Sequence, residues 1–395
     1  MIAVVGIGAD GWEGLGEAAR AAVLGANEVI GSRRQLDLAP VPDAAKRELP
    51  SPLEPLIEEL AARNGAGSTC VLASGDPMLH GIGATLARRL EPGQLEIHPG
   101  LSAFALACAR LRWPEAETTL VSTVARPPET VARALQPGRR LIVYTTNAGA
   151  LATVLRERGF GPSRFVVLEQ LGGPAERMTE SRADTWDETE TDPLHAVAIE
   201  CAAEPGTPVR PTTPGLPDDA FEHDGQITKR HVRAVTVAAL APAPGHLLWD
   251  VGAGSGSIGI EWLRAAPGAR AIAIERRAER AERARANALR LGVPELDVRE
   301  GEAPAALDGL PRPDAVFIGG GVTTPGLLDA CVATGARIVA NAVTLEGEGV
   351  LAAARETHGG TLTRIEISHA EPVGGFTGWR GQMPVVQWSA TPGAA

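Results

Sequence analysis

The residues best suited to chemistry in this chain are an aspartate and a run of glycines around the end of one apolar strand. Asp250 lies near the end of 247-LLWDV-251, and Gly252, Gly254 and Gly256 form a loop before a helical pattern. Glycines let a cofactor approach the backbone at the carboxyl end of a parallel strand, and the next helix offers free N–H groups. The spacing predicts a nucleotide-type cofactor site made of Asp250, Gly252, Ala253, Gly254, Ser255 and Gly256.

Acidic and small residues at the ends of the next two strands extend this site. Glu275 ends the strand after the glycine loop, where a carboxylate can accept hydrogen bonds from both hydroxyls of a ribose. Glu302 and Ala303 follow the third strand and are placed to border an adenine ring. The set is therefore typical of a site for a cofactor that contains adenosine.

Two cofactors of this kind fit the glycine pattern. Gly254, Gly256 and Gly259 match GxGxxG, so a dehydrogenase that binds NAD is an alternative. Asp250 stands two residues before the first glycine, where an acid can orient the methionine end of S-adenosylmethionine (SAM). The residues therefore favour a SAM-dependent methyltransferase over a dehydrogenase.

The first half of the chain contains turns of a different design. Strands are expected to end in the turns 6-GIGADG-11 and 74-SGDP-77, and 99-PGLS-102 leads into an alanine-rich helical pattern. A rigid turn after an apolar strand can place backbone groups against a cofactor. The local alternatives are an ordinary β-turn at the second of these segments and a serine-capped helix start at the third.

Short strands alternate with helical patterns over most of the chain. This alternation in residues 2–201 and again in 228–389 predicts an α/β fold with parallel sheets covered by helices. Prolines recur every third residue from Pro205 to Pro217, which predicts an extended spacer that contributes no core element. We therefore expect domains at residues 1–202 and 218–395, joined by a proline-rich linker at 203–217.

Composition excludes several classes of protein. The 395 residues are 44% hydrophobic and 22% charged, which is typical of a globular protein, and the net charge of −11 disfavours a broad nucleic-acid surface. No apolar run reaches the roughly 18 residues that span a bilayer, and no basic leader precedes Ile2, so we expect a cytoplasmic protein without a membrane partner. The four cysteines form no CxxC pair, and no metal site is expected.

Segments of both halves resemble known families. The second half resembles the decarboxylating methyltransferases of cobalamin biosynthesis, of the CbiT type, through 218-DDAFEHDGQITKRHVRAVTVAAL-240, 314-DAVFIGGG-321 and 337-RIVANAVTLEG-347. The first half resembles the tetrapyrrole methylases, of the CbiE type, through 6-GIGADG-11, 74-SGDPMLHG-81, 98-HPGLSAF-104 and 168-LEQLGGPAERM-178.

The resemblance implies a two-lobed tetrapyrrole methylase domain followed by a doubly wound, Rossmann-like SAM methyltransferase domain. It implies two SAM sites, methylation of carbons 5 and 15 of a corrin precursor (precorrin-6Y or 6B), and loss of carbon dioxide from the ring C acetate, giving precorrin-8X. By resemblance, Thr228 lines the second SAM site. The residues that the resemblance assigns to the first SAM site are Gly8, Gly75, Asp76, Pro77, Gly100 and Ser102.

A tetrapyrrole substrate that carries several carboxylates needs local positive charge. Candidates for this contact are Arg126, Arg230, Arg233 and Arg380, although each is also typical of a solvated surface arginine. The glycine-rich 373-VGGFTGWRG-381 predicts either a loop over a flat macrocycle or a hairpin whose aromatic residues pack on the core.

Two other functions are alternatives to this interpretation. They are a SAM-dependent methyltransferase that acts on RNA or protein, and a fusion that uses nucleotide loops for dehydrogenation or for binding alone. Methyl transfer to carbon mainly requires alignment of two reactants. No catalytic residue is assigned from the sequence, and we expect a homo-oligomer.

Overall fold

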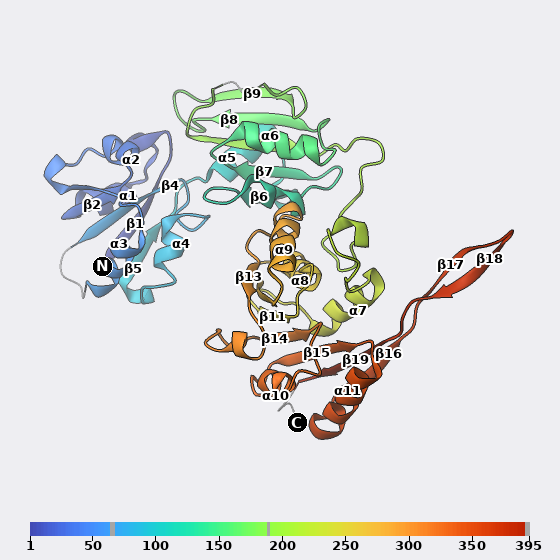
Figure 1. The fold of residues 1–395 in the computed structure, drawn as a ribbon. Coiled ribbons are helices and arrows are strands. Elements are labelled where there is room, and N and C mark those ends of the chain that lie inside the picture. Colours follow the sequence, from blue (N-terminus) through green and yellow to red (C-terminus); the bar gives the residue numbers. More distant parts are fainter. Residues whose placement is uncertain (64–67, 188–189, 392–395) are drawn as a thin grey trace. The chain divides into compact units, whose positions relative to one another are not determined.

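The computed structural model describes residues 1–63, 68–187 and 190–391 (Figure 1). Residues 392–395, at the end of the expected C-terminal domain, lie outside the described residues. The contacts divide the chain into two compact units. Unit 1 comprises Met1–Pro128 and Gln136–Thr207, and unit 2 comprises Glu129–Leu135 and Pro208–Ala395.

The first lobe of unit 1 is a parallel sheet with helices on both faces. Its strand order is β3-β2-β4-β1-β5, so β1 lies between β4 and β5. The strands are β1 (Ile2–Ile7), β2 (Glu28–Gly31), β3 (Lys46–Glu48), β4 (Thr69–Ser74) and β5 (Leu95–His98). Helices α1 (Glu17–Leu24) and α2 (Arg33–Leu38) pack on the face that carries Val5. Helices α3 (Glu54–Ala62) and α4 (Ile82–Leu86) pack on the face that carries Val4.

The second lobe of unit 1 is a mixed sheet of order β6-β7-β10-β8-β9. Its elements are β6 (Thr118–Ser122), β7 (Arg140–Tyr144), β8 (Arg164–Glu169), β9 (Arg177–Arg182), β10 (His195–Glu200), α5 (Ala103–Leu111) and α6 (Ala148–Glu157). Strand β6 is parallel to β7, whereas β10 is antiparallel to both of its neighbours. Helix α5 buries Ala107 and Cys108 against Ile142 and Val166 of this sheet.

Unit 2 is built on one seven-stranded sheet of order β13-β12-β11-β14-β15-β19-β16. Its strands are β11 (Leu247–Val251), β12 (Arg270–Glu275), β13 (Asp297–Glu300), β14 (Ala315–Ile318), β15 (Arg337–Ala342), β16 (Thr361–Ile365) and β19 (Val385–Ala390). The five strands from β13 to β15 are parallel, and β19 is antiparallel to both β15 and β16. Every residue of β11 is buried, because helices cover both faces of the sheet.

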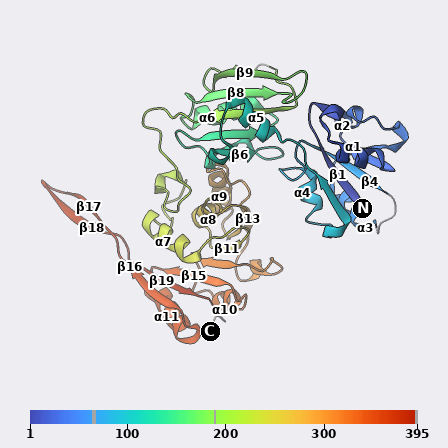
Figure 2. The same cartoon turned by 180° about the vertical axis from the view of Figure 1, so that it is seen from behind.

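Two groups of helices cover the sheet of unit 2 (Figures 1 and 2). They are α7 (Arg230–Leu240), α8 (Ser257–Ala265) and α9 (Ala278–Arg290) on one face, and α10 (Leu327–Val332) and α11 (Leu345–His358) on the other. In α9, Ala281, Ala284 and Ala288 recur at helical spacing and form its buried face. The chain order reverses between β11 and β14, which is where a doubly wound sheet binds ligands.

The expected fold class is confirmed: the chain is α/β, with a two-lobed first unit and a doubly wound second unit. The antiparallel strand β19 also separates this sheet from the dinucleotide-binding order, which continues with a sixth strand beside the fifth. Among the described residues, no helix is long and apolar enough to cross a membrane.

The proline-rich segment departs from the extended spacer expected from its sequence. Residues 208–217 group with unit 2, and Leu216 is 1% exposed within the core of that unit. The buried Arg264 of α8 donates hydrogen bonds to the carbonyls of Arg210 and Pro211 at 2.9 and 3.2 Å. The second half of the segment therefore packs as part of unit 2.

Candidate cofactor-binding sites

The glycine loop of unit 2 follows β11 and lies beside the loop that follows the neighbouring strand β14. Gly252 has a φ of +74°, and a Cβ there would lie 2.9 Å from the backbone nitrogen of Gly320, in the loop after β14. A side chain at this position is therefore excluded by both conformation and space. The two loops meet backbone to backbone, which keeps the carboxyl ends of these strands free of side-chain bulk.

Glu275 lies at this loop, as the sequence predicts. It is 4% exposed, and its carboxylate accepts hydrogen bonds from the backbone nitrogens of Gly254 at 2.8 Å and Arg277 at 3.0 Å. A carboxylate has about four acceptor positions, so two N–H donors leave it able to accept more. The two contacts hold the carboxylate in one place beside the glycines.

Asp250 is buried with only half of its carboxylate satisfied. Its Oδ2 accepts a hydrogen bond from the Gly259 nitrogen at 2.9 Å, whereas Oδ1 has no partner among the described residues. Burial raises the pKa of Asp250 to about 7; the Gly259 hydrogen bond opposes this rise and the negative charge of Glu275 adds to it. The hydroxyl of Ser255 is also buried without a partner among these residues. Unsatisfied acceptors at a glycine loop fit a ligand that brings donors or positive charge.

The other predicted residues of this site are spread around the loop. Gly254 has a φ of +57° and open space at its Cβ position among the described residues, whereas a Cβ at Gly256 would lie 3.0 Å from Ala284 on α9. A side chain at Gly256 would therefore meet helix α9, whereas one at Gly254 would enter open space. Thr228 is half-buried just before α7, and Glu302 lies at the rim with its side chain 72% exposed. Ala253 packs on the core formed with α8 and α9, whereas Ala303 packs on the opposite face of the sheet.

In unit 1, three glycines bring the ends of β1, β4 and β5 together. A Cβ at Gly6 would collide with the Gly75 oxygen and lie 2.6 Å from the Gly100 nitrogen. Gly75 has a φ of +60°, and its own Cβ would lie 3.1 Å from the Leu101 oxygen. Predicted residues Gly75 and Gly100 are thus brought into contact, and Gly6, which was not predicted, packs between them. Its signal was its place as the first glycine of GIGADG.

The remaining predicted residues of unit 1 make local contacts. The Asp76 Oδ1 accepts a hydrogen bond from the Met78 nitrogen at 2.7 Å, and Ser102 caps α5 by accepting one from the Ala105 nitrogen at 3.0 Å. Both local alternatives, a turn and a capped helix, are therefore present in the structure. Pro77 supports Gly81 and Gly83 at the start of α4, and Gly8 packs beside the carboxylate of Asp10.

Tyr144 is a residue of this region that the sequence analysis missed. It comes from β7 in the second lobe, and its Oη accepts a hydrogen bond at 2.9 Å from the nitrogen of Phe104, in the first turn of the helix that Ser102 caps. Burial raises its pKa above the ordinary value. Its signal was that it is the single tyrosine of the chain.

Comparison with known proteins gives a match over both halves. A model described as tetrapyrrole (corrin/porphyrin) methylases matches residues 1–187, and one described as precorrin methyltransferase domain matches residues 219–392. A protein of Sinorhizobium sp named precorrin-6Y C(5,15)-methyltransferase [decarboxylating] is 48% identical over 99% of this chain and 96% of its own length. A protein of the same name from Mycobacterium tuberculosis is 46% identical over 99% of this chain and all of its own length.

The chain belongs to the precorrin-6Y C(5,15)-methyltransferase (decarboxylating) family. The resemblance found in the sequence is thereby confirmed. A solved structure, the C-terminal domain of precorrin-6Y C5,15-methyltransferase from Rhodobacter capsulatus, is 51% identical and covers 46% of this chain and 98% of that chain, with a TM-score of 0.44.

The arginines considered for a precorrin carboxylate differ in their surroundings. Arg233 is fully buried and donates to Glu261 at 2.7 Å, so both expectations for it, a solvated and a substrate-facing arginine, are wrong. Arg230 is exposed and donates to the Gly215 carbonyl at 2.8 Å. Arg380 is exposed and pairs with Glu371 at 3.0 Å, and Arg126 is exposed in unit 1. Arg126, Arg230 and Arg380 therefore remain accessible to a ligand.

The glycine-rich segment 373–381 forms the end of a β-hairpin. Strands β17 (Ser368–Val373) and β18 (Phe376–Gly381) pair only with each other, and the hairpin extends away from the sheet of unit 2 (Figures 1 and 2). Phe376 and Trp379 are 85% and 80% exposed. The alternative of aromatics packed on the core is therefore wrong. At the base of the hairpin, His369 lies 5.5 Å from His231 between ring centres.

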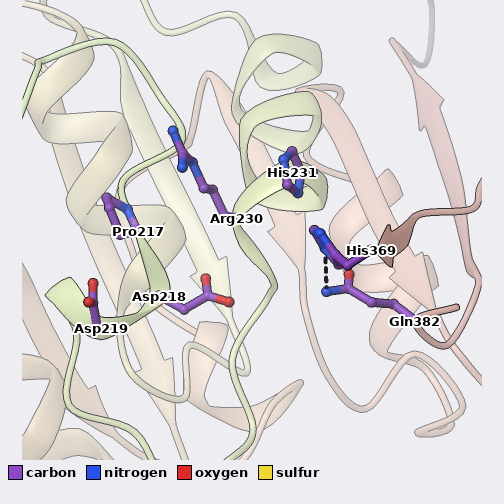
Figure 3. Close-up of a pocket in the computed structure, with 7 residues that line it drawn as sticks. All are labelled: Pro217, Asp218, Asp219, Arg230, His231, His369 and Gln382. Atoms are coloured by element: carbon purple, nitrogen blue, oxygen red, sulfur yellow. Dashed lines mark hydrogen bonds between the residues drawn. The ribbon is translucent and has the colours of Figure 1, made fainter. Parts of the chain in front are cut away.

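A pocket of about 340 Å³ lies at the base of this hairpin (Figure 3). Its walls are formed by the segment before α7, the first residues of α7, the start of β17 and the residue that follows β18. The lining residues are Pro217, Asp218, Asp219, Arg230, His231, His369 and Gln382. Among the described residues, no group of three or more His, Cys, Asp or Glu side chains is arranged to hold a metal ion.

Proposed function

We propose that this chain transfers methyl groups from SAM to carbons 5 and 15 of a precorrin (precorrin-6Y or 6B) and releases carbon dioxide from its ring C acetate, giving precorrin-8X. The observation that carries this proposal is the full-length match to relatives with the name precorrin-6Y C(5,15)-methyltransferase [decarboxylating]. Two partial relatives have names that each state one of the two methylations. A Pyrobaculum calidifontis relative named probable cobalt-precorrin-6B C(15)-methyltransferase (decarboxylating) matches 42% of the chain, and a Salmonella typhimurium relative named cobalt-precorrin-7 C(5)-methyltransferase matches 45%.

The proposal includes one SAM site in each unit and no metal. Bound SAM supplies the methyl group, and the residues of the chain bind and orient it. In unit 2, the open space at Gly254 and the unsatisfied Oδ1 of Asp250 support such a site. Glu275 accepts ribose hydroxyls, and the unpaired Oδ1 of Asp250 accepts a hydrogen bond from the methionine end. The residues proposed to contact SAM in unit 2 are Thr228, Asp250, Gly252, Ala253, Gly254, Ser255, Gly256, Glu275, Glu302 and Ala303.

In unit 1, the proposed SAM site lies where the turns after β1, β4 and β5 meet. The close packing of Gly75 against the backbone of Leu101 supports it, because this packing leaves backbone groups of three turns at one edge of the sheet. Bringing SAM and the substrate together in one orientation is the main catalytic task, since proximity alone lowers the barrier by several kcal/mol. The residues proposed to contact SAM in unit 1 are Gly8, Gly75, Asp76, Pro77, Gly100 and Ser102.

Product mass tests this function directly. The full chain is incubated with the precorrin substrate and labelled SAM, and the product should carry two added methyl groups and lack one carbon dioxide. SAM should also raise the melting temperature, by the amount that corresponds to about 2.7 kcal/mol at 100 times its dissociation constant, whereas NAD should not. A substrate returned unchanged, or protection by NAD alone, would overturn the proposal.

The proposal extends to the organisation of the protein. We assign C(5)-methylation to residues 1–202 and C(15)-methylation with decarboxylation to residues 218–395, with residues 203–217 between them. The two compact units support one activity for each half, and residues 208–217, which group with unit 2, belong with the second activity. A cytoplasmic location is proposed because all four cysteines are buried free thiols, and partners other than the tetrapyrrole are not expected to include nucleic acid, given the net charge of −11.

We also propose a homo-oligomer in which the β17–β18 hairpin contacts a second copy of the chain. The exposure of Phe376 and Trp379 at the end of an extended hairpin supports this, since large aromatic residues are enriched in the cores of interfaces. Light scattering of the double variant F376S/W379S should give the mass of one chain. An unchanged oligomer would contradict this part of the proposal.

A further inference from the structure

Residues 215–228, here named the strap, run from the end of the proline-rich segment to the start of α7. The strap contains only one turn of helix, Asp218–Ala220, so its shape depends on side chains of other elements. Side chains of α7, α8 and α9 bind its backbone at several points along its length. They are the buried Arg233, Glu261 and Asn287 and the partly exposed Arg290.

Asn287 joins the strap to the glycine loop. This α9 residue is 1% exposed, and its Nδ2 donates to the Glu222 carbonyl at 2.9 Å and to the Ser255 carbonyl at 3.0 Å. Its Oδ1 accepts from the Glu222 nitrogen at 2.8 Å and from Arg290 at 2.9 Å. Both donors and both acceptor positions of the amide are therefore used: two bonds go to Glu222 in the strap, one to Ser255 in the glycine loop and one to Arg290.

A second tie connects the strap to the helix that follows the glycine loop. Glu261 of α8 is 1% exposed and accepts from the backbone nitrogens of Gly215 at 2.7 Å and Leu216 at 2.9 Å. It also accepts from Arg233, whose guanidinium in turn donates to the carbonyls of Leu216 and Thr228. The two ends of the strap are thus bound to one buried ion pair.

These buried side chains satisfy backbone groups of the strap and of the glycine loop. An apolar side chain in place of Asn287 would leave the backbone N–H and carbonyl of Glu222 and the carbonyl of Ser255 without this partner, which costs stability for each buried group. Because hydrogen bonds have fixed directions, the amide also holds the two backbone segments at one distance. Here the two segments are the glycine loop at Ser255 and the strap that ends at Thr228.

We propose that the strap forms a wall of the unit 2 cofactor site and that Asn287 is the positioning residue that sets its distance from the glycine loop. This inference rests on the proposed function, because it assigns the site to SAM. Asn287 does not contact the cofactor; it acts through Ser255 on one side and through Glu222 on the other. The Arg233–Glu261 pair fixes the same wall at its ends.

The test is equilibrium dialysis of labelled SAM with the full chain carrying Asn287→Asp. The aspartate keeps the volume and still accepts from Glu222 and Arg290, but it presents an oxygen to the carbonyls of Ser255 and Glu222 where the amide donated. We expect one of the two SAM sites per chain to lose affinity by about tenfold or more and the other to be unchanged, because the two hydrogen bonds that the amide donates are replaced by repulsion between oxygens.

The matched control is Arg264→Met. Arg264 is also a buried polar residue of unit 2 that donates to three backbone carbonyls, those of Arg210, Pro211 and Leu291, but none of these hydrogen bonds reaches the strap or the glycine loop. This variant should lose thermal stability and keep both SAM affinities, measured well below the melting temperatures of both variants.

Three results are decisive. If Asn287→Asp keeps both wild-type affinities while its melting temperature falls as in the control, Asn287 is only structural and the inference is overturned. If Asn287→Asp does not fold, the same measurement on Arg233→Lys, which keeps the charge and shortens the fork that reaches Thr228, must show one weakened site; two intact sites would overturn the inference. If the wild-type chain binds no SAM, the proposed function itself fails.

Discussion

Replacement of Asp250 by asparagine should make unit 2 more stable at neutral and alkaline pH. Asp250 is 1% exposed, its Oδ1 has no partner among the described residues, and burial raises its pKa to about 7 from an ordinary value of 3.8. An asparagine has the same shape and can still accept the hydrogen bond from the Gly259 nitrogen, but it carries no charge.

The size of this stability difference follows from the pKa of Asp250 in the folded chain and its pKa in the unfolded chain. Between about pH 4 and pH 7 the folded chain keeps a proton that the unfolded chain has released, so the free energy of unfolding falls as the pH rises through this range. One pKa step corresponds to about 1.4 kcal/mol, so the total loss is on the order of 4 kcal/mol. About 2–3 kcal/mol of it develops between pH 5 and pH 8.

Chemical denaturation of the full chain at pH 5 and pH 8 measures this loss. The wild type should lose about 2–3 kcal/mol of unfolding free energy relative to Asp250→Asn over this interval, and the variant should be the more stable chain at pH 8. Asp308→Asn, which neutralises an exposed aspartate of the same unit, should leave the difference between the two pH values unchanged. Parallel pH profiles for the wild type and Asp250→Asn would refute the reasoning, because they would show an Asp250 with an ordinary pKa.

Three further predictions concern other contacts. Glu275→Ala removes the acceptor of the Gly254 N–H and the proposed ribose acceptor, so dialysis should show SAM affinity at the unit 2 site reduced by about 1.5–3 kcal/mol; unchanged binding would mean that another acid holds the ribose. Leu216→Ala empties space in the core of unit 2 and should lower its free energy of unfolding by about 2–5 kcal/mol in urea denaturation, whereas a freely extended linker would tolerate the change. Replacing Asp76 and Pro77 by alanine should give a product that carries one added methyl group and has still lost carbon dioxide; mass spectrometry of a doubly methylated product would contradict the division of labour.

Buried strands made of continuous apolar residues could be predicted from the sequence. Strand 247–251 is buried at every position, and β1 is buried at all but one, so a continuous apolar run marked each of them. Strand β9 carries no such signal, because it is an edge strand that pairs only with β8 and its residues RMTESR are almost all exposed. Nothing in such a segment distinguishes a paired edge from a loop.

Part of the candidate site could be predicted from the sequence and part could not. Glycines and acids beside a strand end are recognisable because the strand, the loop and the helix that form the site are consecutive in sequence. Asn287 and Arg233 lie in helices among other polar residues, where an amide or a guanidinium is typical of the surface. Their burial arises only when the strap folds over α7, α8 and α9, which are separated from it by up to about 70 residues of sequence. The expectation of a solvated Arg233 was wrong for this reason.

In both units, close packing between backbone segments requires glycine at the edge of the sheet where the proposed cofactor site lies, although the two folds differ. In unit 1, Gly6 of β1 packs against the backbone of Gly75 and Gly100, which follow its two neighbouring strands, and in unit 2 Gly252 packs against Gly320 after the neighbouring β14. In both cases the strand pairs with a neighbour that is distant in sequence, β4 and β5 for β1 and β14 for β11, so the loops that meet at its end cannot be paired from the sequence alone. Each glycine is nevertheless required, because a Cβ would strike backbone, which cannot move aside as a side chain can. This requirement explains why both edges were visible as glycine patterns while their partners were not.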